Sequence, residues 1–571
     1  MEIKSFSFNN EGRKEIEKMT KGKNWPVVYM LHNKKDLYIG ETTSAYGRIS
    51  QHLQNPEKSG LTTIQVVFDD TYNKSVILDF EQRLIKYTKT DRRFKNVLNK
   101  NVGQSASHNY YQRDKYEAEF QWLWKKLIEK DIAIHDSAKL ENENIFKYSP
   151  YNSLTEEQNL ISIEILNNIC DCFENNEKQT CIVNGGAGTG KTVMAISIIY
   201  SIVSAININE TEIEDELSDD KIKALIRLKK LIEEKGKFKL GFVFPMTGIR
   251  NTIKKVFHDS GNGLTANMVI SPNNVIDEEY DILFVDESHR LCKRKNIVNM
   301  ASFDKTCRTL GLDKNTSNQL DWILLRSKCQ ILFYDVNQTI KGADITYDEF
   351  QDSLVKNGGE LHEYQLTTQM RCKGGDSYVD YVQRIMNLGQ ITSETVSNYD
   401  FKIFDNVDLM VNEIKRLDKI CGLCRNVAGY SWKWTTKGKG KTYKELKDKQ
   451  LYDIEIDKYK YIWNLKTEGW ILRDDAIDTI GCIHTTQGYD LNYVGVIFGK
   501  EIDYNPLSNT IEVDLTKFYD TNVKRSTPPD VVKQYIINTY TTMMTRGIKG
   551  CYVYACNKNM QNYLKRFISS F

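Results

Sequence analysis

A glycine-rich stretch between an apolar run and a helical pattern constrains the fold of this chain more than any other feature. Residues 181–183 predict a buried strand, and residues 193–199 predict an apolar helix. Between them the chain fits the spacing GxxxxGK followed by Ser or Thr, which is the phosphate-binding loop pattern. Glycines in such a loop let backbone N–H groups point at phosphate oxygens, and the helix that follows adds its positive end. The fixed positions of the pattern are Gly185, Gly190, Lys191 and Thr192.

The loop predicts a site for ATP with Mg²⁺. Lys191 is expected to reach the β- and γ-phosphates, and the Thr192 hydroxyl is expected to bind the cation. An apolar run at 282–285 ends in two acids, of which Asp286 is expected to hold Mg²⁺ and Glu287 to polarise the attacking water. The residues expected to surround the nucleotide are Gly185, Gly186, Ala187, Gly188, Thr189, Gly190, Lys191 and Thr192.

The length and composition exclude several classes of protein. A chain of 571 residues is too long for one hydrophobic core, so several domains are expected. The net charge of +2 excludes a polycation, so nucleic acid would have to bind at local basic patches. No apolar run approaches the ~20 residues of a membrane span, and the first residues do not form a signal-peptide pattern. Twelve scattered cysteines predict reduced thiols in the cytoplasm, and the single CxxC, Cys421 and Cys424, lacks the second pair of a zinc site.

The first hundred residues predict a small α+β module that carries polar side chains at fixed places. Two strands, 25–31 and 37–41, are joined by a turn and predict a hairpin. A helix at 45–53, a strand at 64–68 and a helix from Ser75 follow. Hydrolysis of a phosphodiester needs a base for water, a cation against the developing charge and usually a metal, and this module carries side chains for each role. The side chains are Tyr29, Tyr38, Arg48, His52 and Glu81.

This set of residues resembles the GIY-YIG nuclease family. Tyr38, Ile39 and Gly40 match the second half of that name, and the first half keeps its tyrosine as Tyr29. The resemblance implies that Tyr29 is the general base, directly or through a water, with Tyr38 beside it. It also implies an arginine that stabilises charge, a histidine that orients water, a glutamate that binds one Mg²⁺ or Mn²⁺ and an asparagine that closes the site, which are Arg48, His52, Glu81 and Asn96. The alternative is a domain of this type that binds nucleic acid without cutting it.

Several short motifs after residue 150 resemble those of superfamily 1 helicases. Residues 154–158, Leu-Thr-Glu-Glu-Gln, precede the phosphate loop as an adenine-reading glutamine motif does. Over residues 151–571 the chain resembles the helicase-like domain of Schlafen proteins and of bacterial proteins catalogued as a domain of unknown function. The resemblance implies one glutamine that reads adenine, one that senses the γ-phosphate, two arginine fingers and a Gln-Gly pair that contacts nucleotide and nucleic acid. These residues are Gln158, Gln338, Arg371, Arg546, Gln487 and Gly488.

Two aromatic stretches each have two interpretations. The helix predicted at 116–130 carries an aromatic stripe that would either pack against a core or stack bases. Residues 425–434 alternate aromatic side chains with Lys433, and three more lysines follow within seven residues. Base stacking beside a basic loop and a tryptophan-rich edge of a core both fit this second pattern.

Together these patterns predict a small α+β GIY-YIG module followed by tandem RecA-like α/β lobes with parallel sheets. The predicted boundaries are 1–108 for the nuclease module, 109–150 for a helical linker, 151–355 for the first lobe and 356–571 for the second. The predicted function is an ATP-dependent nuclease-helicase that acts on nucleic acid, DNA in preference to RNA, in defence against foreign DNA. The alternatives are an RNA-directed nuclease of the Schlafen-like type and an ATP-switched nucleic-acid sensor or scaffold without unwinding.

Overall fold

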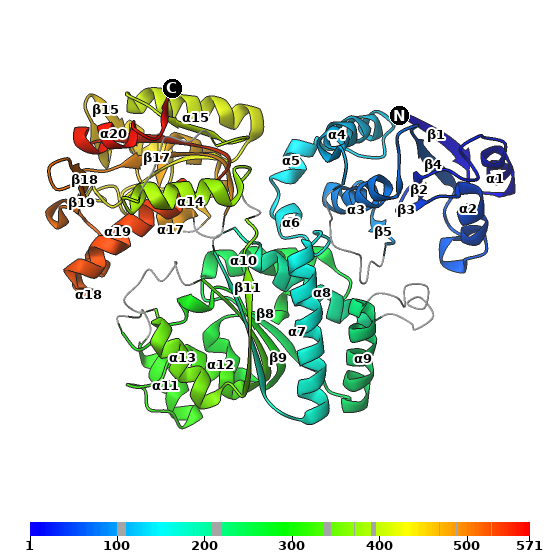
Figure 1. The fold of residues 1–571 in the computed structure, drawn as a ribbon, viewed down its shortest axis with the longest axis horizontal. Helices are drawn as coiled ribbons and strands as arrows, with labels where there is room; N and C mark the ends of the chain where they lie inside the picture. The colour runs from blue at the N-terminus through cyan, green and yellow to red at the C-terminus, as the bar shows by residue number, and fades with distance from the viewer. Residues whose placement is uncertain are drawn as a thin grey trace. The chain divides into compact units, whose positions relative to one another are not determined.

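The computed structural model describes residues 1–99, 110–186, 188–207, 220–295, 297, 300–335, 344–369, 372–389, 396–466, 469–486, 489–526 and 528–571. Its helices and strands are labelled in Figure 1. The chain divides into two compact units. One comprises residues 1–170, 193–237 and 253–266, and the other comprises residues 171–192, 238–252 and 267–571.

The N-terminal sheet has the strand order β1-β4-β2-β3-β5. The predicted hairpin is confirmed, because β2 and β3 pair antiparallel with Tyr29 opposite Gly40. β1 and β2 both pair antiparallel with β4, and β5 pairs parallel with β3. The strands are β1 Glu2–Ser7, β2 Val27–His32, β3 Asp36–Thr42, β4 Thr63–Phe68 and β5 Asn96–Val97.

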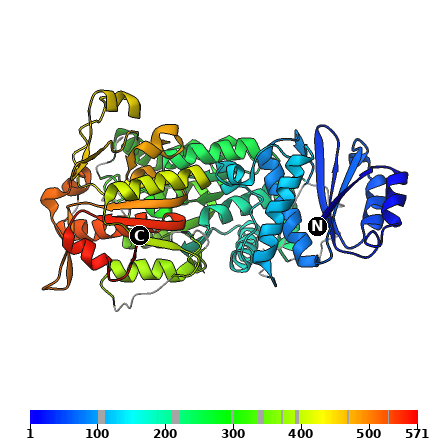
Figure 2. The same cartoon turned by 90° about the horizontal axis from the view of Figure 1, so that it is seen from above.

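Both faces of the N-terminal sheet are covered by helices, as Figure 2 shows for its blue strands. Successive side chains of a strand point to opposite faces. Tyr29 and Leu31 therefore lie in the core under α1 and α2, whereas Val28 and Met30 lie in the core under α3 and α4. The aromatic stripe of α4 packs in this second core, which favours the core-packing interpretation of that helix. The helices are α1 Asn10–Glu17, α2 Ala45–Leu53, α3 Lys74–Asp91, α4 Arg113–Glu129, α5 Ser137–Glu141 and α6 Asn144–Lys147.

The next sheet, called the first parallel sheet below, has the order β11-β6-β10-β9-β7-β8, and every described pair in it is parallel. β10 lies between β6 and β9, so the carboxyl ends of these three strands are neighbours. The strands are β6 Gln179–Gly185, β7 Leu240–Val243, β8 Val269–Ile270, β9 Tyr280–Val285, β10 Ser327–Tyr334 and β11 Glu360–Leu366. The helices of this stretch are α7 Glu156–Asn175, α8 Lys191–Ile206, α9 Asp220–Lys235, α10 Thr247–Ser260, α11 Met300–Leu310, α12 Gln319–Arg326 and α13 Tyr347–Asn357.

The second parallel sheet has the order β16-β13-β17-β20-β12-β21. Its described pairs are all parallel, which confirms the prediction of two parallel α/β sheets. The strands of the sheet are β12 Asp400–Ile403, β13 Cys424–Ala428, β16 Ile480–Gly481, β17 Leu491–Phe498, β20 Gly547–Ala555 and β21 Ser569–Ser570. Two small hairpins are β14 Ile454–Ile456 with β15 Tyr459–Tyr461, and β18 Ile502–Asn505 with β19 Thr510–Val513. The helices are α14 Gly375–Met386, α15 Val407–Cys421, α16 Tyr443–Asp448, α17 Ile483–Thr486, α18 Thr521–Ser526, α19 Pro529–Met544 and α20 Lys558–Leu564.

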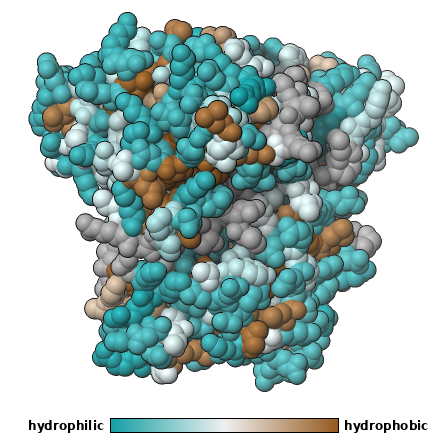
Figure 3. Space-filling view, turned by 60° about the vertical axis from the view of Figure 1, so that its left-hand side comes forward, coloured by the Kyte–Doolittle hydropathy of each residue, from teal (hydrophilic) through white to brown (hydrophobic). Residues whose placement is uncertain are grey.

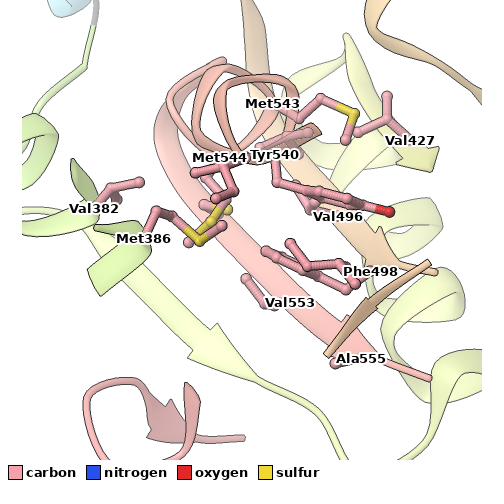
Figure 4. Packing of buried hydrophobic residues seen from close by; sticks show 14 of the residues in the cluster. Val382, Met386, Val427, Val496, Phe498, Tyr540, Met543, Met544, Val553 and Ala555 are labelled. Carbon is pink, nitrogen blue, oxygen red and sulfur yellow. The ribbon is translucent and has the colours of Figure 1, made fainter. Parts of the chain in front are cut away.

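A dense apolar core fixes α19 on the second parallel sheet, as shown in Figure 4. The rings of Phe498 and Tyr540 stack with centroids 4.2 Å apart and planes 13° apart. Met543 and Met544 are fully buried at the end of the same helix.

The face of the molecule drawn in Figure 3 is largely polar. Hydrophilic side chains cover most of the face drawn in Figure 3, and apolar side chains form small groups between them. None of the described helices is both long enough and apolar enough to cross a lipid bilayer.

Candidate functional site

The phosphate-loop pattern forms a tight turn between β6 and α8. Gly188 and Gly190 have φ values of 91° and 79°, in the left-handed region that favours glycine. A Cβ on Gly185 would lie 2.6 Å from the Thr189 hydroxyl, so the loop closes on itself at this glycine. Ala187, which was predicted to contact nucleotide, lies outside the described residues.

Lys191 points its amine into the loop. Its Nζ donates to the carbonyl oxygens of Gly185 and Gly186, the second at 2.9 Å. The same atom lies 3.4 Å from a carboxylate oxygen of Asp335, which is buried at the end of β10. The amine is thus held at the mouth of the loop, where the predicted phosphate contacts require a positive charge.

Thr192, in the first turn of α8, meets Asp286 at the carboxyl end of β9. The Thr192 hydroxyl donates to Asp286 Oδ2 at 2.6 Å. Asp286 follows the last residue of β9 and is completely buried. Burial, followed by the charge of Glu287, raises the pKa of Asp286 above its ordinary value. Mg²⁺ is commonly held by one or two protein groups plus the phosphates of its nucleotide, so this hydroxyl and carboxylate fit that cation.

Glu287 is the second acid at the end of β9. Its backbone has a φ of 50°, and its Oε2 lies 2.9 Å from His289 Nε2. Burial alone would raise the pKa of Glu287, but the charge and hydrogen bond of His289, with Arg290 and Lys191, lower it below the ordinary value. Glu287 is therefore a carboxylate at neutral pH, as a residue that orients water requires.

Asp335 is a member of this site that the sequence analysis did not single out. The buried run before it predicts a strand, and β10 lies between β6, which leads into the phosphate loop, and β9, which ends directly before Asp286. The signal was an acid directly after a strand, the same signal that identified Asp286. Gln338, the residue predicted there, lies outside the described residues.

The remaining residues predicted in the helicase-like region are only partly described. Gln158 accepts a hydrogen bond from the Thr155 N–H at 3.1 Å, and its own N–H donates to the Thr155 hydroxyl at 3.2 Å, so the pair caps α7. Arg546 is buried directly before β20, and its carbonyl accepts from the Leu491 N–H. Pairing of Gln158 with adenine and contact of Arg546 with a phosphate stay predictions. Three further predicted residues lie outside the described ranges and are Arg371, Gln487 and Gly488.

A second candidate site, called the tyrosine cluster below, lies on the N-terminal sheet. The Tyr29 hydroxyl is 2.6 Å from His52 Nε2. The ring centroid of Tyr38 lies 6.3 Å from that of Tyr29 and 5.1 Å from that of His52. A Cβ on Gly40 would lie 2.3 Å from the Tyr29 hydroxyl oxygen, so the Tyr29 side chain fits here only because residue 40 has no side chain.

Lys58 belongs to the tyrosine cluster although the sequence analysis did not predict it. Its Nζ is 2.7 Å from His52 Nδ1 and 3.5 Å from the ring centroid of Tyr38. Burial, followed by the charges of Lys58 and Arg48, lowers the pKa of His52 to about 3. His52 is neutral at pH 7, and the ammonium of Lys58 donates to Nδ1, so the one ring proton lies on Nε2. His52 therefore donates to the Tyr29 oxygen.

Arg48 and Glu81 act on the same two tyrosines. Against the larger effect of burial, the positive charge of Arg48 lowers the pKa of both Tyr29 and Tyr38. Burial first, then Tyr38 and the charge of Glu81, raise the pKa of Tyr29 well above its ordinary value. Glu81 is buried on α3. The cluster thus brings together a phenol, an arginine and a carboxylate predicted for phosphodiester chemistry.

Two asparagines lie near the tyrosine cluster: Asn96, which the sequence analysis predicted to close the site, and Asn99, which it did not single out. The Asn96 side chain is exposed and donates to Asp36 Oδ1 at 2.7 Å. Asn99 is buried, accepts from the Ile39 N–H at 3.0 Å and donates to the Ile39 carbonyl at 2.7 Å. Asn99, which the sequence analysis passed over, therefore secures the strand between Tyr38 and Gly40.

Metal-binding groups are sparse in the part of the chain that the structure describes. There, no three His, Cys, Asp or Glu side chains gather in a way that could hold a metal ion. The carboxylates that the sequence analysis predicts as cation ligands are Asp286, beside the phosphate loop, and Glu81, in the tyrosine cluster. Cations at these sites would need the phosphates of a ligand to complete their coordination.

Comparison with known proteins places a family over most of the chain. Residues 178–557 match the family described as Schlafen group 3, DNA/RNA helicase domain. The chain is also 28% identical, over 322 residues, to the uncharacterized protein YPL245W of Saccharomyces cerevisiae. This alignment covers 50% of the chain. The aligned region spans 64% of the yeast protein's length. The family match includes the phosphate loop and Asp286 and begins after the tyrosine cluster, so the nuclease module stays a prediction.

Proposed function

We propose that this chain, which belongs to the Schlafen group 3 helicase family through residues 178–557, is a nucleoside triphosphatase that acts on nucleic acid. The observation that carries the proposal is the hydrogen bond from Thr192 to Asp286 at the end of β9. It joins the hydroxyl of the phosphate loop to a buried carboxylate, which is the pair that holds the cation in nucleotide-hydrolysing sites of this pattern.

The other residues of the site fit roles in hydrolysis. Lys191 would neutralise the β- and γ-phosphates, since its amine already lies at the mouth of the loop. Glu287, whose pKa is lowered, would accept a hydrogen bond from the attacking water and orient it. A bound Mg²⁺ would supply positive charge between the phosphate oxygens. ATP is the expected nucleotide.

The tyrosine cluster supports a second activity, cleavage of phosphodiester bonds. Tyr29 receives a hydrogen bond from His52. Burial and the charge of Glu81 oppose the phenolate of Tyr29, whereas the hydrogen bond from His52 and the positive charge of Arg48 favour it. Glu81 would hold Mg²⁺ or Mn²⁺, which would offset the charge that now raises the pKa of Tyr29. After its own proton has passed to solvent, Tyr29 would take the proton of the attacking water, and Arg48 would stabilise the charge on phosphorus oxygens.

Nucleotide hydrolysis is tested with single substitutions in the phosphate loop. We expect Lys191→Ala and Thr192→Ala each to lower ATP turnover by at least about tenfold. Lys305→Ala and Thr309→Ala, both on α11, are the matched controls and should keep wild-type turnover. Undiminished turnover in the two loop variants would contradict the proposal.

Nuclease activity is tested on labelled single- and double-stranded DNA and RNA, with Mg²⁺ or Mn²⁺ and with or without ATP. DNA is the expected substrate. Cleavage of RNA in place of DNA would favour the alternative, an RNA-directed nuclease. Glu81→Gln should abolish cleavage and leave ATP turnover unchanged, while Glu117→Gln, an exposed partner of Arg83, should keep both. Cleavage that persists in Glu81→Gln would remove the nuclease assignment and leave the nucleotide site intact.

A further inference from the structure

Two cysteines face each other at the turn between α15 and β13. Cys421 is the last residue of α15, and Cys424 is the first residue of β13. Their Sγ atoms are 3.6 Å apart, and neither sulfur is in a disulfide. The intervening Gly422 and Leu423 have φ values of 69° and 46°, so both adopt left-handed backbone that folds the turn back.

The two thiols have different environments. Cys421 is partly exposed, whereas Cys424 is buried. The hydrogen bond from Cys424, against the opposing effect of burial, lowers the pKa of Cys421 to about 7. The same hydrogen bond, followed by burial, raises the pKa of Cys424. In dithiols that exchange with disulfides, the thiol of lower pKa attacks the disulfide first and the second thiol then resolves the mixed disulfide; Cys421 and Cys424 fit these two roles.

The turn that carries the two thiols is firmly positioned. Asp418 Oδ1 accepts from the Cys424 N–H at 2.8 Å and from Arg425 Nη1 at 2.9 Å. Asn492 Nδ2 donates to the carbonyls of Cys421 and Gly422, each at 2.9 Å. The sulfur atoms therefore stay close, and only a small further approach separates 3.6 Å from a disulfide bond of about 2.05 Å.

We propose that Cys421 and Cys424 form a reversible disulfide by exchange with a small disulfide such as oxidised glutathione. The Cys421 thiolate attacks one sulfur of glutathione disulfide, which forms a mixed disulfide and releases one glutathione thiolate. Cys424 then loses its proton and attacks the Cys421 sulfur, which releases the second glutathione. Two protein thiols are oxidised to one disulfide, and one glutathione disulfide is reduced to two thiols.

The proposal is tested on the full-length protein equilibrated across a series of reduced-to-oxidised glutathione ratios. After acid quenching and alkylation, peptide masses should show a Cys421–Cys424 disulfide whose fraction rises along the series and falls again on return to reduced glutathione. Cys421→Ser and Cys424→Ala should each abolish it. Cys556→Ser is the matched control, because Cys556 is also partly exposed but burial raises the pKa of its thiol to about 12.

A second measurement needs no variant. At pH 7, iodoacetamide should alkylate Cys421 of the reduced wild-type protein at least about tenfold faster than Cys556, because the thiolate is the reactive form. Thiols at every glutathione ratio, a disulfide that never returns to thiols, or equal alkylation of Cys421 and Cys556 would each overturn the proposal.

Discussion

Gly40 gives a direct test of how the tyrosine cluster is built. A methyl group at this position would lie 2.3 Å from the Tyr29 hydroxyl oxygen and 2.4 Å from Cζ. Tyr29 is almost fully buried, so its ring has no open space in which to move away. Overpacking of this kind costs about 1–3 kcal/mol, and we expect Gly40→Ala to destabilise β2 and β3 by that amount.

The assay for Gly40→Ala is hydrogen exchange of the peptides that cover residues 27–42, because local opening reports the stability of this sheet within a long chain. Gly60→Ala is the control, since no atom lies within 4 Å of the added methyl group. A double-mutant cycle with Tyr29→Ala adds a second criterion. That truncation alone should cost about 3–5 kcal/mol, and the clash disappears in the double variant, so the two effects should fall short of additivity by about 1 kcal/mol or more. Additive effects, or a Gly40→Ala variant as stable as Gly60→Ala, would refute the reasoning.

Two further predictions concern a buried histidine and a buried carboxylate. The pKa of His52 is lowered to about 3 in the folded protein, so between pH 3 and about 6.5 the unfolded chain binds more protons there. The free energy of unfolding should therefore fall by about 1.4 kcal/mol for each pH unit below about 6.5. Lys58→Met should make this fall smaller, because the charge of Lys58 is one of the causes that lower the pKa of His52. C2-proton exchange of His52, followed by mass spectrometry against pH, checks the pKa of His52 in both proteins. Asp453 accepts from the N–H groups of Thr436 and Trp463 at 2.8 and 2.9 Å, so Asp453→Ala should cost about 2–4 kcal/mol by leaving both donors unpaired. Faster proteolysis of residues 430–466 checks this, with exposed Asp448→Ala as control, and equal rates in the two variants would contradict it.

Local patterns predicted the elements of the first parallel sheet. The phosphate loop and the acidic strand end could each be identified because an apolar strand and a fixed polar spacing are continuous in sequence. The phosphate-loop pattern leads us to expect that Thr192 and Asp286 share one Mg²⁺, but the order of β6, β10 and β9 that brings them together is not contained in local spacing. Asp335 was visible as an acid after a strand, and only the sheet order gives it a place beside Lys191.

Residues buried by tertiary structure were the ones that sequence reasoning missed. Lys58 lies in a polar stretch that is typical of an exposed loop, and its burial depends on how this stretch folds back on His52 and on Tyr38 of β3. The choice between Asn96 and Asn99 depends on the register in which β5 meets β3, because that register leaves Asn96 at the surface. Sequence spacing alone does not carry this information.

The aromatic stretch after β13 shows a mixed outcome. Trp432 is 9% exposed and packs in a core, which favours the interpretation as a core edge. Trp434 is only partly buried, and Lys437 Nζ lies 5.1 Å from its ring centroid. A pattern of alternating aromatics and lysines does not say which ring faces inward, since that depends on the path of the loop.

The start of β17 links the cysteine turn to the predicted arginine finger. Asn492 sits where the register with β20 shifts, and its N–H donates to the Leu423 carbonyl at 2.9 Å. The preceding residue, Leu491, donates to the Arg546 carbonyl at 3.2 Å. The adjacent N–H groups of Leu491 and Asn492 thus connect the backbone of Arg546 to the turn that carries Cys421. An environment-sensitive dye attached at Cys421 would consequently serve as an optical reporter of movement at Arg546 during a nucleotide cycle.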